Sequence, residues 1–277
     1  MRTDILLVTP RNDEESLQIL KIAEKLNIPH LVSKQPHGAR LHNEPELVDQ
    51  ILTATQQDLA IVENPSLEAE DQLQKAGKSV HIIDHHRYDD LNRMKPESSL
   101  EQFLALFEIT EGDLENGGFD NDLVQAVGAL DRGFVWELRK VGYAGDRYQK
   151  ALEYYQALGR EVDGETWDIE TEAAAKSYAE RRTEGDYLVV EQEEDRPSIR
   201  EAISFLIAAD YEKEPPQAII RQGKARIYLQ DSKSATMLHE KFGGFTFGQD
   251  LCWGIDARQT DHVPSVEEVL AALRSEG

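Results

Sequence analysis

The chain has 277 residues, which is enough for one or two domains with full hydrophobic cores. Hydrophobic residues make up 40% of the chain and charged residues 30%, a balance that is typical of globular proteins and excludes a disordered chain. The net charge of -23 favours solubility, and it also disfavours long nucleic acids, whose binding depends on lysine and arginine.

Neither a membrane-spanning segment nor a cysteine-based site is predicted. No apolar run approaches the roughly 18–20 residues that cross a bilayer. The single cysteine, Cys252, excludes an intramolecular disulfide and zinc sites of the finger type. The apolar stretch at residues 5–8 is too short for a signal peptide and predicts a buried strand. We therefore expect a cytoplasmic protein with no membrane partner; the oligomeric state stays open.

Short strands and helices alternate along the first 83 residues. The predicted strands cover residues 5–8, 30–32, 59–62 and 80–83, and the predicted helices cover residues 17–26, 46–53 and 67–76. This alternation is typical of an α/β fold with a doubly wound, mostly parallel sheet and helices on both faces. Such sheets bind ligands at the carboxyl ends of their strands, so the residues that follow each strand are the candidates for chemistry.

The pattern from residue 100 to 182 is mostly helical, and its leucine and aromatic stripes predict core packing. At Gly185 the pattern changes to mixed strands and helices, with Ser198 and Glu201 as a predicted capping box for one helix. Strands are predicted at 187–190, 217–220 and 225–230, and helices at 198–209, 234–240 and 266–273. We therefore expect an N-terminal domain of residues 1–184 and a smaller C-terminal α/β domain of residues 185–277.

The sharpest local signal is Asp84-His85-His86, which directly follows the predicted strand at 80–83. At the carboxyl end of a buried strand both rings can point into a crevice. The adjacent carboxylate can fix a ring tautomer or share a metal ion. A surface turn that happens to be polar is the competing interpretation.

Acidic residues follow two other predicted strands: Asp13 and Glu15 come shortly after the first, and Glu63 directly follows the third. Acids at a helix start also cap its free N–H groups and favour its dipole, which explains Asp13 and Glu15 without a metal. Acids and a histidine at three strand ends are a rarer combination. Carboxylate and imidazole together suit Mn²⁺ or Mg²⁺ better than a metal that prefers soft ligands.

Over roughly its first 185 residues, the chain resembles the DHH phosphoesterase superfamily. That superfamily includes single-strand exonucleases, oligoribonuclease and cyclic-dinucleotide phosphodiesterases, and manganese-dependent inorganic pyrophosphatases. Its first motif is His-x-x-x-Asp-x-Asp, its second an Asp at a strand end, its third Asp-His-His, and its fourth an Asp after an apolar helix. The matching residues are Thr9, Asp13 and Glu15 for the first motif, Glu63 for the second, Asp84-His85-His86 for the third and Asp131 for the fourth.

The resemblance implies a metal centre in which this chain differs from the family. Thr9 stands where the family has a histidine, and two family aspartates are replaced by glutamates. One ion would be held by Glu15, Glu63, His85 and Asp131. The other, held by Asp13, Glu63 and Asp131, would have lost its imidazole. We therefore expect one Mn²⁺ or Mg²⁺ ion, at the His85 side.

The resemblance also implies roles in catalysis. His86 would contact the phosphate, and Asp84 would support the two histidines. The family's chemistry is the metal-assisted attack of water on phosphorus, in which metal ions stabilise the attacking and leaving oxygens. The loss of one ion would damage that chemistry most, so a catalytically weakened relative stays an alternative.

A basic stretch interrupts the negative charge, because residues 217–241 contain five lysines and arginines against two acids. Arg221 and Arg226 are therefore the predicted substrate-binding residues, suited to one or a few phosphates but not to a long strand. The leading hypothesis is a metal-dependent phosphoesterase that acts on a small phosphorylated molecule or short oligonucleotide. The first alternative is a DHH-like protein that binds a phosphorylated ligand or a protein partner without catalysis. The second is an unrelated doubly wound ligand-binding domain in which Asp-His-His occurs by chance.

Overall fold

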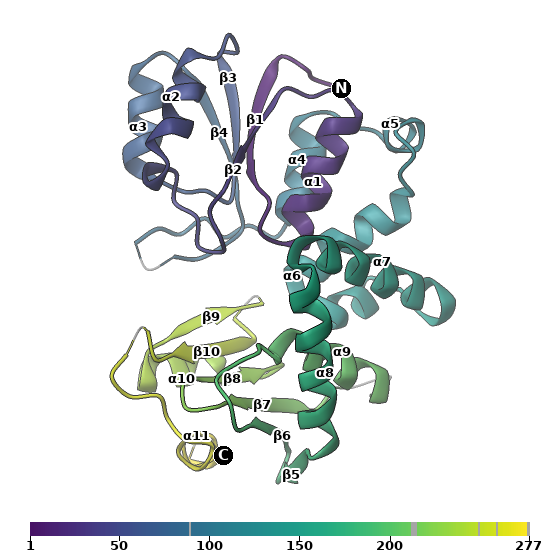
Figure 1. Ribbon diagram of the computed structural model, residues 1–277, viewed down its shortest axis with the longest axis vertical. Coiled ribbons are helices and arrows are strands. Elements are labelled where there is room, and N and C mark those ends of the chain that lie inside the picture. Colours follow the sequence, from purple (N-terminus) through teal and green to yellow (C-terminus); the bar gives the residue numbers. More distant parts are fainter. Residues whose placement is uncertain (89, 212–214, 249, 259, 276–277) are drawn as a thin grey trace. The chain divides into compact units, whose positions relative to one another are not determined.

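The computed structural model in Figure 1 describes residues 1–277 except 89, 212–214, 249, 259 and 276–277. Contacts within the chain group it into two compact units: Met1–Arg132 with Glu137–Val162, and Gly133–Trp136 with Asp163–Gly277. The domain boundary between residues 184 and 185 stays a prediction. Within the described residues, no helix has both the length and the apolar character that a membrane span needs.

The first unit contains a four-stranded parallel sheet in the order β2-β1-β3-β4. Its strands are β1 (Ile5–Pro10), β2 (His30–Ser33), β3 (Asp58–Val62) and β4 (Ser79–Ile83). The order reverses between β1 and β3, so the carboxyl ends of these two strands flank the switch point where such sheets bind ligands. The α/β fold expected from the alternating pattern is confirmed.

Helices cover both faces of this sheet (Figure 1). On one face α2 (Pro45–Thr53) and α3 (Leu67–Lys75) bury apolar side chains against β1 and β3, beside the short helix η1 (Leu41–Asn43). On the other face α1 (Glu14–Lys25) packs on β1 and against α4 (Ser99–Leu106). All six residues of β1 are buried, as expected for a strand that is covered on both sides.

Three further helices follow, α5 (Glu111–Asn116), α6 (Asn121–Lys140) and α7 (Gly145–Asp163). The backbone of α6 departs from helical geometry at Gly133 and Phe134, and Phe134 has a left-handed φ of 56°. This kink follows Asp131 by two residues. The last full helical turn before the kink therefore carries the predicted fourth-motif aspartate.

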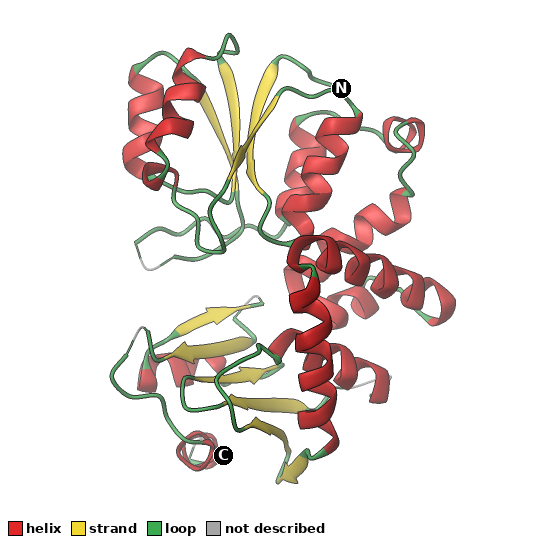
Figure 2. Cartoon of the chain, viewed as in Figure 1, coloured by secondary structure: helices red, strands yellow, loops and turns green. Residues whose placement is uncertain are grey.

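The second unit is built on a six-stranded mixed sheet in the order β5-β6-β7-β8-β10-β9. Its strands are drawn in yellow in Figure 2 and labelled in Figure 1. Its strands are β5 (Arg182–Glu184), β6 (Tyr187–Gln192), β7 (Gln217–Gln222), β8 (Arg226–Gln230), β9 (Phe245–Phe247) and β10 (Cys252–Asp256). Its helices are α8 (Glu165–Ala179), α9 (Arg200–Asp210), α10 (Ala235–Phe242) and α11 (Val266–Arg274). Successive residues of β6 point to opposite faces, so Leu188 packs with α8 and α9 while Val189 packs with α10 and α11.

The predicted capping box of α9 is wrong. The N-cap position is occupied by Ile199, and no side chain caps the helix locally. The Ile199 N–H instead donates to the side-chain oxygen of Gln222 at 3.2 Å. The Ser198 N–H, which the capping box would pair with Glu201, donates to Oε1 of Glu170 at 3.3 Å.

We expect Arg226→Ala to destabilise the protein, because Arg226 forms a buried ion pair. Its Nε donates to Oδ2 of Asp256 at 2.5 Å, and the side chains are 11% and 8% exposed. Removal of one partner from such a pair costs about 3 kcal/mol or more. Arg258→Ala is the matched control, because Arg258 contacts the same carboxylate from a side chain that is 77% exposed. Thermal unfolding should show a large decrease in Tm for Arg226→Ala alone, and equal effects of the two changes would contradict this assignment.

The stability of the protein should also depend on pH through Asp231. Burial raises the pKa of Asp231 to about 7, although the indole N–H of Trp136 donates to its carboxylate at 2.5 Å and acts in the opposite direction. The folded state then holds a proton that the unfolded state releases, so stability falls as pH rises from 3.8 to about 7. We expect wild type to lose stability relative to Asp231→Asn over this interval. Unfolding curves of the two proteins at a series of pH values measure the difference, and parallel profiles would refute the assignment.

Candidate metal centre

The predicted ligands gather at the carboxyl edge of the parallel sheet. Glu15, Glu63, His85 and Asp131 offer ligand atoms that all lie within 4.8 Å of one another. Glu63 directly follows β3, His85 lies two residues after the end of β4, and Glu15 lies in the first turn of α1. Asp131 comes from α6, more than 40 residues later in the chain. The fold thus brings together four of the five residues that the sequence nominated as metal ligands.

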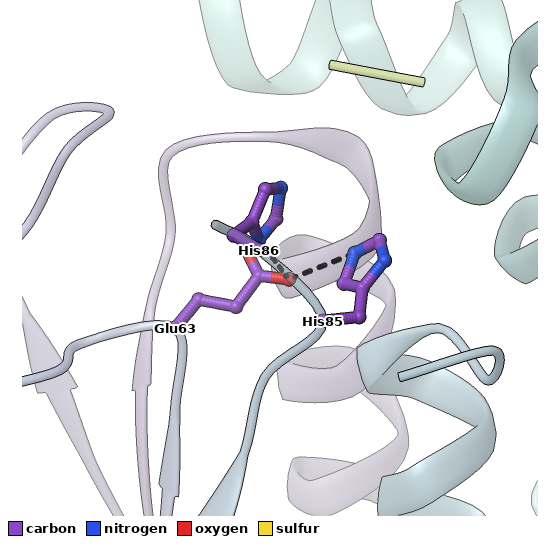
Figure 3. Close-up of side chains that lie close together, drawn as sticks. All are labelled: Glu63, His85 and His86. Carbon is purple, nitrogen blue, oxygen red and sulfur yellow. Dashed lines mark ion pairs between the residues drawn. The ribbon is translucent and has the colours of Figure 1, made fainter. Parts of the chain in front are cut away.

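The two histidines share Glu63, as Figure 3 shows. Oε1 of Glu63 lies 3.5 Å from Nε2 of His85 and 3.7 Å from Nδ1 of His86. Nε2 of His85 also lies 2.6 Å from Oδ2 of Asp131. One imidazole nitrogen therefore faces two carboxylate oxygens at distances that neighbouring ligands of one cation would have.

One atom from each of these four side chains is buried without a hydrogen-bond partner among the described residues. These atoms are Oε2 of Glu15, Oε1 of Glu63, Nε2 of His85 and Oδ2 of Asp131. The 2.6 Å contact between His85 and Asp131 is close enough for a hydrogen bond, but its geometry is not that of one. Buried polar atoms almost always have partners, so four exceptions in one place need an explanation. Three carboxylate oxygens and one imidazole nitrogen fit a hard or borderline divalent cation.

Glu15 is held in place by the start of α4. Its Oε1 accepts the backbone N–H of Leu100 at 2.8 Å, where the helix has unpaired donors, and this leaves Oε2 for the cluster. Burial, followed by the negative charges of Asp131 and Glu63, raises the pKa of Glu15 well above its usual range. The ionised form of Glu15 is therefore disfavoured when no cation is bound.

Glu63 occupies an unusual backbone position, with a left-handed φ of 42° directly after β3. Its N–H donates to the carbonyl of Ile83 at 3.0 Å, which ties it to the end of β4. Burial opposes ionisation of Glu63, but the positive charges of His86 and His85 outweigh it and lower its pKa to about 2. Non-glycine residues with such backbone angles occur preferentially at functional sites.

Asp84 organises the second histidine. This carboxylate is 1% exposed, and its Oδ1 accepts both the backbone N–H of His86 at 3.0 Å and the ring Nδ1 at 3.2 Å. Its Oδ2 accepts the hydroxyl of Tyr88 at 3.0 Å. Burial lowers the pKa of His86, but Glu63 and Asp84 outweigh it and raise it to about 9. The sequence analysis missed Tyr88, for which the only signal was its position two residues after His86.

Asp13 lies beside the group of four and not within it. It is the N-cap of α1, and its Oδ1 accepts the N–H of Ser16 at 2.7 Å, as the helix-cap interpretation expected. Burial and the charge of Glu63 raise its pKa to about 6. Thr9 is fully buried, and its hydroxyl donates to the carbonyl of Pro10 at 3.2 Å. The sequence analysis also missed His37, which faces Asp13 from the loop after β2.

The two arginines predicted to bind substrate have partners in the second unit. Arg226 pairs with the buried Asp256. The guanidinium of Arg221 donates to the backbone carbonyls of Gly223, Lys224 and Pro264 at 2.6–3.0 Å. These contacts hold the hairpin and the segment before α11. A role in substrate binding stays a prediction for both residues.

We expect Glu15→Gln to raise the Tm of the metal-free protein, because it removes a buried charge beside two other carboxylates. Glutamine keeps an oxygen that can accept the N–H of Leu100. Each kcal/mol gained should raise Tm by roughly 2–4 °C. Glu24→Gln, at an exposed position of the same helix, should change little. The comparison is a melting experiment at pH 8 with a chelator, and an unchanged or lower Tm for Glu15→Gln would show that the repulsion is small.

Comparison with known proteins finds only distant likenesses. No protein-family model matches the chain, and no curated protein matches it. Among solved structures, exonuclease RecJ bound to manganese aligns with 91% of this chain and 85% of its own, at 14% identity and a TM-score of 0.43. The pGpG-specific phosphodiesterase PggH from Vibrio cholerae covers 99% of both chains at 11% identity and a TM-score of 0.40. An uncharacterized protein from Helicobacter pylori G27 covers 98% of both at 10% identity and a TM-score of 0.35.

Proposed function

We propose that this chain is a metal-dependent phosphoesterase that acts on small phosphorylated molecules or short oligonucleotides. The observation that carries the proposal is the group of four buried ligand atoms, from Glu15, Glu63, His85 and Asp131, that converge without hydrogen-bond partners among the described residues. They lie at the sheet edge where α/β proteins bind ligands. Carboxylates and an imidazole are the ligand set that Mn²⁺ or Mg²⁺ accepts.

We assign one tightly held divalent cation to this group. When bound, this cation would act as a Lewis acid that polarises a phosphoryl oxygen and activates water. Thr9 contributes no ligand to the group, since its hydroxyl is buried and donates to Pro10. The identity of the ion follows from the donor set only as far as Mn²⁺ or Mg²⁺.

His86 and Asp84 have supporting roles in the proposed reaction. Asp84 holds the ring of His86 through Nδ1, so Nε2 is the atom that can donate to a phosphate oxygen. In the metal-free chain Glu63 and Asp84 raise the pKa of His86 to about 9, and its side chain is 44% exposed. Tyr88 restrains the other oxygen of Asp84 and so fixes the carboxylate that orients the ring.

The charge of the chain favours small substrates. A net charge of -23 repels a long polyanion, and salt screens this repulsion only beyond about 8 Å at physiological ionic strength. A substrate with one or a few phosphates requires only the local positive charge of the cation and His86.

The test is a hydrolysis panel in Mn²⁺ that runs from a small aryl phosphodiester through dinucleotides to a long single strand. We expect turnover of the small members, loss of turnover with excess chelator, and at least a 100-fold loss in His85→Ala (order-of-magnitude expectation for the loss of a catalytic ligand). His81→Ala is the control, because His81 lies in β4 and faces Asp58 at 4.0 Å instead of the cluster. Preferential degradation of the long strand would refute the charge argument.

A non-catalytic DHH-like binding protein is the second candidate, and the missing imidazole at Thr9 favours it. In that case His85→Ala and wild type would be indistinguishable throughout the panel. Binding of a phosphorylated ligand or protein partner would then persist without turnover.

A further inference from the structure

The candidate metal centre holds two carboxylates close together from helices that are far apart in the sequence. Glu15 belongs to α1 and Asp131 to α6, and their ligand atoms lie within 4.8 Å of each other. Two ionised carboxylates at such a separation repel each other, most strongly where water is excluded. Contacts outside the cluster must therefore hold both of them. The first turn of α4 has contacts on both sides.

On one side, α4 holds Glu15 through a backbone donor, because the N–H of Leu100 donates to its Oε1 at 2.8 Å. A capping box closes the turn that presents this donor. In that box Oγ of Ser98 accepts the N–H of Glu101 at 3.3 Å, and Oε2 of Glu101 accepts the N–H of Ser98 at 2.8 Å. Glu101 therefore stabilises the turn that holds Glu15.

On the other side, the same Glu101 binds Arg132, the residue that directly follows Asp131. Nη1 of Arg132 lies 2.6 and 2.5 Å from the two carboxylate oxygens of Glu101, and the side chains are 15% and 25% exposed. Directly after Arg132, the backbone of α6 leaves helical geometry at Gly133. Arg132 therefore anchors the last helical turn before the kink, which is the turn that carries Asp131.

Close packing of α6 on the start of α4 supports this anchor. Gly128 lies about one helical turn before Asp131 and Arg132. A Cβ atom at Gly128 would lie 2.7 Å from Oγ of Ser98 and 3.5 Å from Cγ of Glu101. The first of these contacts is too short for a real side chain. Glycine at this position therefore allows the backbone of α6 to approach the first turn of α4 this closely.

We propose that Glu101 and Arg132 are positioning residues of the metal centre, which set the separation of Glu15 and Asp131 by fixing both to the first turn of α4. Glu101 acts on Glu15 through the capping box and on Asp131 through Arg132. Neither Glu101 nor Arg132 is itself a candidate ligand. The inference rests on the proposed function in so far as the group of four candidate ligands binds a divalent cation.

The test is the Mn²⁺ affinity of the metal-free full chain, measured by calorimetric titration and by the electron paramagnetic resonance spectrum of the bound ion, whose line shape depends on the ligand geometry. Arg132→Gln and Glu101→Gln should each weaken binding by about 10-fold, as changes to the partners of metal ligands do. Glutamine at position 101 can still form the capping box, so this variant reports the ion pair. Arg132→Lys keeps the charge and should recover part of the affinity.

Two further variants test whether the pair acts as a unit and through α6. The double variant with Arg132→Gln and Glu101→Gln should bind Mn²⁺ no more weakly than either single variant, because each change alone already breaks the pair. Gly128→Ala should also weaken binding, although it leaves Glu101 and Arg132 in the chain. Its methyl group would displace α6 from the start of α4.

The matched control is Arg93→Gln. Arg93 pairs with Glu70 at 2.6 Å, and the side chains are 23% and 10% exposed. Glu70 also accepts the N–H of Ser66, the N-cap of α3, so this pair likewise combines an ion pair with a contact at a helix start. Among the described residues, the candidate ligand groups include none from α3. Arg93→Gln should therefore bind Mn²⁺ as wild type does.

Each other outcome is decisive. Unchanged Mn²⁺ affinity and line shape in both Arg132→Gln and Glu101→Gln would overturn the positioning role and leave the proposed function intact. Equal losses of affinity in Arg132→Gln and Arg93→Gln would also overturn it, because affinity would then follow general stability. Binding of no ion to wild type would remove the proposed function together with this inference. A melting curve of each metal-free variant verifies that the titrated chains are folded.

Discussion

The burial of three carboxylates around one imidazole is the constraint on which the rest of the site depends. Burial and the negative charges of Asp131 and Glu63 raise the pKa of Glu15 well above its usual range, whereas His86 and His85 lower the pKa of Glu63. His85 supplies one positive charge, and burial, which lowers the pKa of its ring, is outweighed by Asp131 and Glu63, which raise it to about 12. A divalent cation would supply two charges at the same point.

The elements around the site hold its four candidate ligands in place. The start of α4 fixes Glu15, the ends of β3 and β4 fix Glu63 and His85, and the turn before the kink of α6 carries Asp131. Each of the four side chains therefore comes from a different element of the fold. Rigid elements of this kind are suited to holding ligands in a geometry prepared for an ion.

Most of the fold could be predicted from the sequence, because the strands of the first sheet are short apolar runs and their ends are marked by polar residues. Position after a strand also predicted Glu63, Asp84 and His85. The position of His37 opposite Asp13 could not be predicted in this way, since it depends on the path of a loop. The partners of Arg221 and Arg226 could not be predicted from local sequence either. Pro264, which contacts Arg221, and Asp256, which pairs with Arg226, each lie 30 or more residues later in the chain. Local patterns predict elements, whereas the pairing of side chains depends on how those elements pack.

The left-handed backbone of Glu63 limits how this site can change over time. Asparagine, aspartate and glycine adopt such angles more readily than other residues, whereas β-branched residues are strongly disfavoured there. Aspartate would therefore suit the backbone better than glutamate, but it is one methylene group shorter. At this position the length needed to reach the site favours glutamate, whereas the backbone conformation favours aspartate. A substitution that shortens the side chain of residue 63 would therefore require the end of β3 to move closer to His85, which follows β4.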